Sequence, residues 1–219
     1  MDEQQGATFM REGKYEEAAK YFTAYIEENP KEAVGYVNMG NLLHVLGDQE
    51  RAHIFFERAI ELEPDSAVAY YSAGTLYYEQ EMYEQAIQHF KHAHKNGLDE
   101  ADLYYMLGMS YYQQGTLPHA LANFSRAHEM NEMDVEVCFQ YGLCLAQLEQ
   151  LTEARRLFEK TLSLDETHAD AHYNLGVAQA ANNEIDEALA SFTRALHSQP
   201  DHLLAGNGKR VVEDALNKG

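Results

Sequence analysis

The chain has 219 residues, and its 36 Asp and Glu against 16 Lys and Arg give a formal net charge of −20. Phosphate backbones and anionic lipid headgroups are bound by clustered Lys and Arg, so this composition disfavours nucleic-acid and membrane partners. The opening residues, MDEQQGATF, hold no basic segment followed by an apolar run, and no window approaches the roughly 18 apolar residues of a membrane span. We therefore expect a protein that works in the cytoplasm.

A period of 34 residues runs through the sequence without insertion or deletion. Three positions of this period hold the same residue type in every copy. These columns are Gly6, Gly40, Gly74, Gly108, Gly142 and Gly176; Ala18, Ala52, Ala86, Ala120, Ala154 and Ala188; and Phe22, Phe56, Phe90, Phe124, Phe158 and Phe192. Such a period indicates stacked supersecondary units, because each unit is too small to bury its apolar face alone and covers it with its neighbours.

The period divides the chain into six repeats and a final segment. Their boundaries are residues 1–32, 33–66, 67–100, 101–134, 135–168, 169–202 and 203–217. The first repeat lacks the opening turn of its first helix. In each complete repeat, apolar residues recur at the i, i+3, i+4, i+7 spacing of a helix face, stop at a turn such as Gly47-Asp48, and resume in a second helix that ends near the position of Pro64. Each repeat is therefore predicted to be an antiparallel helix pair.

Several local features give further expectations. Asn96-Gly97 predicts a helix that ends in a left-handed cap, and Pro118 fits the first turn of a helix. The glycine and alanine columns should allow helices to approach closely, whereas the phenylalanines should reach out of their own pair into the next. Residues 203–217 predict a final capping helix whose apolar side shields the last repeat. That side carries Leu204, Val211, Val212, Ala215 and Leu216.

With these columns in place, the sequence resembles the tetratricopeptide repeat family over nearly its whole length. The aromatic and small-residue pattern of that family is matched in one repeat by Tyr36, Met39, Gly40, Leu43, Ala52, Phe56, Ala59 and Pro64. The resemblance implies an all-α fold, a right-handed solenoid of antiparallel helix pairs formed by residues 1–219 as a single domain. It also implies that the first helices line a concave groove and the second helices form the convex back. The most similar proteins in character are small bacterial ones that consist only of such repeats.

The first helices carry a second face that packing within the pair does not require. A solvated helix face should be polar, but this face is mostly apolar or aromatic, which indicates contact with a partner. The predicted groove consists of Asn38, Asn41, His44, Tyr71, Tyr78, Tyr105, Met106, Met109, Tyr112, Phe139, Gln140, Leu143, Tyr173 and Asn174. The tyrosines at 71, 105 and 173 also fit a purely structural role, since the family often places Tyr in this column.

The predicted groove carries acidic side chains at its edges and no Lys or Arg on its complete first helices. Its edges carry Glu79, Asp102, Glu136 and Asp170. The complete first helices hold no Lys or Arg in residues 33–46, 67–80, 101–114, 135–148 and 169–182. Chaperone-binding members of the family clamp a terminal carboxylate with Lys, Arg and Asn, and here only Asn38 and Asn41 match that clamp. We therefore expect a ligand segment with apolar anchors and basic residues rather than a terminal carboxylate.

The two cysteines do not indicate redox or metal chemistry. Cys138 and Cys144 lie six positions apart on one predicted helix, which separates their Cα atoms by roughly 9 Å of rise and prevents a disulfide between them. Both fall in columns that packing residues fill elsewhere. We expect small buried thiols.

Catalytic and metal-binding motifs are sparse. The pairs His89/His92 and His168/His172 have helical ligand spacings, but neither has an evident third ligand, so packed or solvated histidines are favoured. There is no H-E-x-x-H, phosphate-binding glycine loop or G-x-S-x-G elbow. We therefore expect no enzyme activity, no metal and no cofactor.

The function that fits these features best is a non-enzymatic scaffold or adaptor. It would bind an extended or helical segment of another protein in the groove. The alternative is self-assembly, in which the groove or the N-terminal end buries a second copy of the chain.

Overall fold

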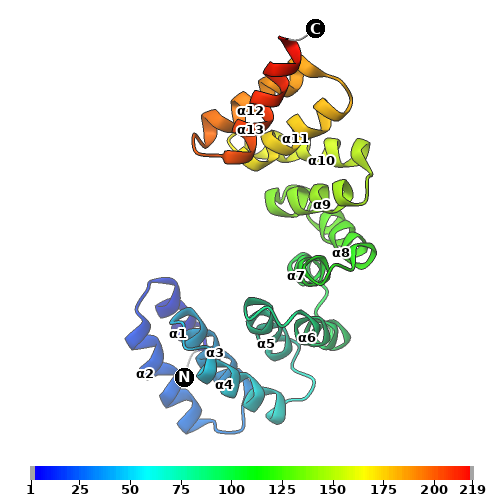
Figure 1. Ribbon diagram of the computed structural model, residues 1–219. Coiled ribbons are helices and arrows are strands. Elements are labelled where there is room, and N and C mark those ends of the chain that lie inside the picture. Colours follow the sequence, from blue (N-terminus) through cyan, green and yellow to red (C-terminus); the bar gives the residue numbers. More distant parts are fainter. Residues whose placement is uncertain (1–2, 218–219) are drawn as a thin grey trace. The chain divides into compact units, whose positions relative to one another are not determined.

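The computed structural model describes residues 3–217, and in this range it contains thirteen α-helices joined by turns and short loops. The helices are α1 (Glu3–Arg11), α2 (Tyr15–Glu28), α3 (Ala33–Val45), α4 (Gln49–Leu62), α5 (Ala67–Glu79), α6 (Tyr83–Lys95), α7 (Ala101–Gln113), α8 (Leu117–Met130), α9 (Val135–Gln147), α10 (Leu151–Leu164), α11 (Ala169–Ala181), α12 (Ile185–Ser198) and α13 (Leu203–Leu216). Each predicted repeat supplies one first helix and one second helix (Figure 1). The all-α class and the helix-pair content are confirmed.

The chain forms two compact units, residues 1–115 and residues 116–219. Unit 1 holds α1 to α7, and unit 2 holds α8 to α13. The boundary falls between α7 and α8, inside the fourth predicted repeat. A single continuous solenoid over residues 1–219 stays a prediction.

Helices pack in the order that the repeats predict within each unit. In unit 1 the pairs α1/α2, α3/α4 and α5/α6 pack together, and in unit 2 so do α9/α10 and α11/α12. First helices also contact one another, α3 with α5, α5 with α7, and α11 with α13. Each unit is therefore a stack in which the first helices form one layer and the second helices the other.

The turn inside each repeat uses one left-handed residue. These residues are Gly13, Gly47, Glu81, Gly115, Glu149 and Asn183, one per repeat and all in the same column. At Gly47 φ is +80°, which glycine adopts without strain, whereas Glu149 is held at φ +60°. The left-handed cap predicted at Asn96-Gly97 is confirmed by φ +101° at Gly97, and Pro118 lies in the first turn of α8 as predicted.

The glycine and phenylalanine columns pack against each other. A Cβ atom added to Gly40 would lie 2.5 Å from Phe56, and one added to Gly142 would lie 2.8 Å from Phe158. The expectation that each phenylalanine reaches out of its own pair was therefore incomplete, because the ring first fills the space above the glycine of its own repeat. Phe56 does also join a core cluster that contains Leu76 of the following repeat.

The final helix packs only partly as predicted, since Val212 is buried as expected but most of the other predicted apolar residues are not. Ala205 and Val212 are the buried residues of α13, and a Cβ atom on Gly208 would lie 2.8 Å from the Phe192 ring. Leu204 and Val211, which were expected to shield the last repeat, are 58% and 64% exposed. They lie one residue before Ala205 and Val212, and one residue turns the side chain by about 100° around the helix. The apolar side of α13 is thus mostly solvent-facing.

The remaining expectations concern thiols and membrane spans. Cys138 and Cys144 are both free and buried, as predicted. Burial raises the pKa of Cys144 to about 11, so this thiol is a poor nucleophile near neutral pH. Among the helices that the structure describes, none combines the length and the apolar character that crossing a bilayer requires.

Candidate functional site

The predicted groove residues lie on first helices of both units, as expected, on α3, α5 and α7 in unit 1 and on α9 and α11 in unit 2. All but one of them are half-buried. Phe139 is 6% exposed, and its ring centroid lies 4.4 Å from that of His168 and 6.1 Å from that of Phe158. Its assignment to the groove is therefore corrected to the core. Unlike the tyrosines of the same column, this side chain has no hydroxyl to keep at the surface.

A first hollow of about 230 Å³ opens on the first-helix layer of unit 1. It is lined by Val34, Val37, Asn38, Asn41, Glu63, Ser66 and Val68. The two asparagines provide amide donors and acceptors on one wall, and Val34 and Val68 provide apolar surface. The site predicted at Asn38 and Asn41 is thus a concave feature of α3 and the start of α5.

A second hollow of about 220 Å³ adjoins the first. It is lined by Val68, Tyr71, Leu98, Glu100, Asp102 and Leu103. Val68 lines both hollows and is 57% exposed, so the two hollows meet at this side chain. The Tyr71 ring packs 5.6 Å from Phe90 while its other side lines the hollow. Burial raises the pKa of Tyr71, and the nearby carboxylates of Asp102 and Glu100 raise it further.

A hydrogen bond joins α3 to α5 on the same layer. His44 Nε2 lies 2.6 Å from Glu79 Oε2, so the predicted groove residue His44 is held by a carboxylate that was predicted at the rim. Tyr78 packs against Tyr83 with a centroid distance of 5.7 Å, and burial raises its pKa. These residues join neighbouring helices, and none of them lines either hollow.

On α7, the predicted groove residues Tyr105, Met106, Met109 and Tyr112 are half-buried. Beside them, the Ser110 hydroxyl donates to the Met106 carbonyl oxygen at 2.7 Å. Two long thioether side chains next to two tyrosines give this helix an adaptable surface. The structure is thus consistent with α7 as an extension of the first-helix surface of unit 1.

In unit 2 the polar groove residues are engaged within their own helices. Gln140 Nε2 donates to Glu136 Oε1 at 2.8 Å, and Asn174 Nδ2 donates to the Asp170 carbonyl oxygen at 2.8 Å. The Tyr173 ring lies between two other rings, 6.0 Å from Phe192 and 5.2 Å from His202. Leu143 is partly buried against the core of α9 and α10. Val177 on α11 is 44% exposed and was not in the predicted groove set.

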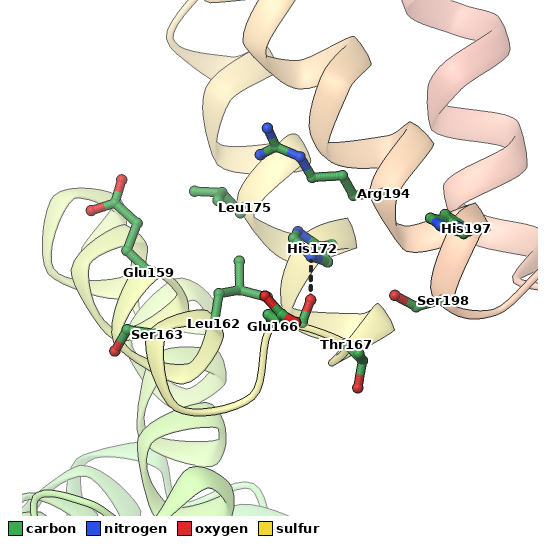
Figure 2. A pocket seen from close by; sticks show the side chains of 10 residues that line it. All are labelled: Glu159, Leu162, Ser163, Glu166, Thr167, His172, Leu175, Arg194, His197 and Ser198. Atoms are coloured by element: carbon green, nitrogen blue, oxygen red, sulfur yellow. Dashed lines mark hydrogen bonds between the residues drawn. The ribbon is translucent and has the colours of Figure 1, made fainter.

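Another cleft, of about 670 Å³, lies on the second-helix side of unit 2. Figure 2 shows Glu159, Leu162 and Ser163 of α10 on one wall, Arg194, His197 and Ser198 of α12 on the other, and His172 and Leu175 of α11 at the floor between them. The sequence analysis considered His172 as a possible metal ligand and favoured a packed or solvated histidine, so it did not predict this cleft. The signal was its column, which holds Tyr36, Tyr70 and Tyr104 in earlier repeats.

The floor of this cleft contains an unusual polar atom. Nε2 of His172 lies 3.0 Å from the Glu166 carbonyl oxygen, and because a carbonyl only accepts, Nε2 carries the proton. The other ring nitrogen, Nδ1, is buried and has no hydrogen-bond partner in the described part of the chain. Burial lowers the pKa of His172, and nearby Arg194 lowers it further. The ring is therefore a neutral acceptor beside an arginine.

Metal chemistry has no support in the geometry. Within residues 3–217, no three His, Cys, Asp or Glu side chains are arranged to hold a metal ion. His89 Nδ1 is hydrogen-bonded to the Gln85 carbonyl oxygen at 2.9 Å, and His168 Nδ1 accepts from the Ala171 amide at 3.2 Å as a helix cap. Both histidines are thus tied to the backbone of their own helices.

Comparison with known proteins identifies the family. The tetratricopeptide repeat profile matches residues 4–67 and 142–202, and a second profile of the same repeat matches residues 55–88. The chain therefore belongs to the tetratricopeptide repeat family, a class of protein-interaction scaffolds.

Individual relatives agree with this assignment. The TPR repeat-containing protein YrrB of Bacillus subtilis (strain 168) is 49% identical over 41 residues, which is 19% of this chain and 20% of the length of YrrB. The crystal structure of YrrB, described as a TPR protein with an unusual peptide-binding site, matches with a TM-score of 0.80 and 41% identity over 88% of this chain and 99% of that one. Two further structures share the fold. PilF of Pseudomonas aeruginosa matches with a TM-score of 0.84 and 17% identity over 94% of this chain and 93% of that one. MamA matches with a TM-score of 0.70 and 22% identity over 74% of this chain and 94% of that one.

Proposed function

We propose that this chain is a non-enzymatic cytoplasmic scaffold that binds a peptide or helical segment of a partner protein on its first-helix layer. The observation that carries the proposal is the pair of adjoining hollows on α3 and α5 of unit 1, which share Val68. They combine amide groups, apolar walls and an aromatic ring, which are the features that fix and orient a bound segment. The 41% identity to YrrB, described as peptide-binding, supports it.

The acidic side chains around these hollows favour a partner segment that carries Lys or Arg. Glu63 lines the first hollow, and Glu100 and Asp102 line the second. No Lys or Arg occurs on α3, α5 or α7, so these carboxylates are not offset locally. Lys or Arg in the partner would pair with them or lie over the Tyr71 ring. Small apolar residues of the partner would rest on Val68, and the Asn38 and Asn41 amides would bond its backbone.

Mutation of the hollows tests the proposal. A partner is captured from the native cell with the wild-type chain, and its affinity is then measured for each variant. Tyr71→Ala should weaken binding by about 1–3 kcal/mol, roughly tenfold to a hundredfold, and Asn38→Ala should weaken it less. Added salt should also weaken binding, because it screens the carboxylates.

The control is charge reversal on the second-helix side, Lys91→Glu, which should change little. Melting temperatures are measured for all variants, since Tyr71 also packs on Phe90. Normal binding by folded Tyr71→Ala and Asn38→Ala, together with loss of binding by Lys91→Glu, would place the site on the other side and refute the proposal.

Self-assembly is the second candidate, and one observation favours it. Helix α13 exposes Leu203, Leu204 and Val211, at 81%, 58% and 64%. A second copy that covered these side chains would remove a sizeable apolar surface from water. Light scattering should then give a dimer or larger species that Leu204→Glu converts to a monomer, whereas a monomeric wild-type chain would exclude it.

A further inference from the structure

Equivalent positions between the helices of the two units hold different side chains. Three periods separate α4, α5 and α6 of unit 1 from α10, α11 and α12 of unit 2, so Tyr70 corresponds to His172 and His92 corresponds to Arg194. In both units the position lies between successive second helices, with a first helix as its floor. The proposed peptide site lies on the first-helix layer, and the following inference is independent of it.

Aromatic rings fill this position in unit 1. The Tyr70 and His92 rings are stacked, with centroids 4.9 Å apart and an interplanar angle of 17°. Tyr77 and His89 continue the cluster with centroids 4.7 Å apart. The chain thus covers the floor of this cleft with its own aromatic side chains.

The corresponding position in unit 2 has no such stack. The Tyr77 and His89 positions are taken by Gln179 and Ser191, whose side chains are joined by a hydrogen bond of 2.7 Å from Ser191 Oγ to Gln179 Oε1. His172 is shorter than a tyrosine, and Arg194 stands in place of the stacking histidine. His172 and Arg194, at the Tyr70 and His92 positions, line the cleft of about 670 Å³ in unit 2.

Three features of this cleft match one kind of occupant. Leu162 and Leu175 give it an apolar floor and wall, and Figure 2 shows the Arg194 side chain extending above His172 and Leu175. No salt bridge or hydrogen bond of Arg194 is present within the described residues, so its guanidinium plane is free to stack. The buried Nδ1 of His172 accepts and has no donor.

We propose that this cleft binds a tyrosine side chain of a partner protein, which takes the place that the Tyr70–His92 stack has in unit 1. The ring packs on Leu162 and Leu175, the Arg194 guanidinium lies over its face, and the phenol hydroxyl donates to His172 Nδ1. Because Nδ1 is buried, the hydroxyl reaches it only after the imidazole rotates.

The charged side chains around the cleft favour a neutral aromatic ligand over an anionic one. Two carboxylates, those of Glu159 and Glu166, belong to residues that line the cleft, and the chain as a whole carries a net charge of −20. Glu159 is already paired with Arg155 at 2.9 Å, which leaves Arg194 and Glu166 as charges of opposite sign. A carboxylate ligand would meet repulsion at Glu166, whereas a phenol needs no counter-charge.

The test is a titration of the full chain with N-acetyl-tyrosinamide, followed by NMR of the leucine and isoleucine methyl groups. Saturable ring-current shifts are expected at Leu162 and Leu175. Ile60, which corresponds to Leu162 in unit 1, is the internal control and should not shift, because rings already fill that cleft. N-acetyl-leucinamide should give no comparable shifts, and N-acetyl-phenylalaninamide should bind more weakly because it lacks the hydroxyl.

Variants make the assignment specific. Arg194→Ala removes an exposed side chain and should weaken binding about two- to fivefold, as loss of a cation–π contact does. Arg156→Ala, at another exposed arginine of unit 2, should leave it unchanged. His172→Tyr should close the cleft and abolish the shifts. The proposal is overturned if Leu162 and Leu175 show no saturable shift, or if Arg194→Ala binds like the wild type. Equal affinity for the tyrosine and phenylalanine amides would refute the hydrogen bond to His172.

Discussion

The corresponding clefts of the two units show what the repeat fixes and what it leaves free. Between α4 and α6, Tyr70 stacks on His92 at 4.9 Å and the chain fills the space itself. Between α10 and α12, His172 and Arg194 occupy the same positions, and a cleft of about 670 Å³ remains. The glycine and phenylalanine columns beneath are the same in both. Changes at a few column positions thus leave an open cleft in place of a packed surface without altering the fold.

The shared columns should respond alike in both units. Phe56 and Phe158 occupy one column, are 0% and 1% exposed, and each lies over a glycine of its own repeat. Phe56→Ala and Phe158→Ala should therefore each lower the free energy of unfolding by about 3–5 kcal/mol. Urea unfolding followed by circular dichroism measures both. A large loss in one unit and a negligible loss in the other would show that the columns do not act equally.

Exchanging the residues at the variable positions should make the two clefts more alike. Tyr70→His replaces the stacked phenol ring with a smaller imidazole and should lower the free energy of unfolding by at most about 0.5–1.5 kcal/mol, the value of an aromatic pair beyond its buried area. His172→Tyr should raise stability slightly or leave it unchanged, because the ring fills the cleft and removes a buried acceptor without a donor. A loss of several kcal/mol in His172→Tyr would show that the cleft of unit 2 cannot hold a tyrosine ring.

The left-handed turn column offers a smaller comparison. Gly47 and Glu149 occupy the same turn position, with φ of +80° and +60°. Glu149→Gly should relieve left-handed strain and raise the free energy of unfolding by about 0.5–1 kcal/mol, because the entropy that glycine loses on folding offsets part of the gain. Gly47→Ala should have the opposite sign. Thermal unfolding measures both, and a destabilised Glu149→Gly variant would contradict this view of the turn.

The last prediction concerns the pH dependence of the free energy of unfolding, and the expected difference between variants and wild type develops only as the solution becomes acidic. Burial lowers the pKa of both His89 and His172, so each binds fewer protons folded than unfolded. Their contribution to stability is therefore complete above the ordinary histidine pKa of about 6.5 and is lost as pH falls through the folded pKa. In urea unfolding between about pH 7 and pH 5, His89→Gln and His172→Gln should each lose less stability than the wild type. Slopes equal to that of the wild type would show that neither histidine is held neutral.

The sequence was sufficient for the framework because its signals are local and periodic. The glycine, alanine and phenylalanine columns give the helix pairs, and Asn96-Gly97 and Pro118 give helix ends that the structure confirms. The apolar residues of α13 were less informative, since periodicity shows that a helix is amphipathic but not which stripe meets its neighbour. Leu204 and Ala205 are adjacent, yet only Ala205 is buried.

The candidate sites were harder to predict for a related reason. Phe139 and Tyr71 share a column, but one ring is core and the other lines a hollow, and the difference depends on how far each ring inserts. The cleft at His172 arises from the absence of rings that other repeats supply. A missing side chain is visible in a sequence only when equivalent positions are compared, here Tyr70 with His172.

The central claim is that the first-helix layer of unit 1 binds the partner. It is tested most directly by photo-crosslinking with benzoylphenylalanine placed at Val68, which both hollows share, and at Lys91 on the second-helix side. In native cells, the Val68 probe should crosslink a partner protein at a segment that carries apolar residues and Lys or Arg, and the Lys91 probe should not. Crosslinks to the same partner from Lys91 and none from Val68 would contradict the account.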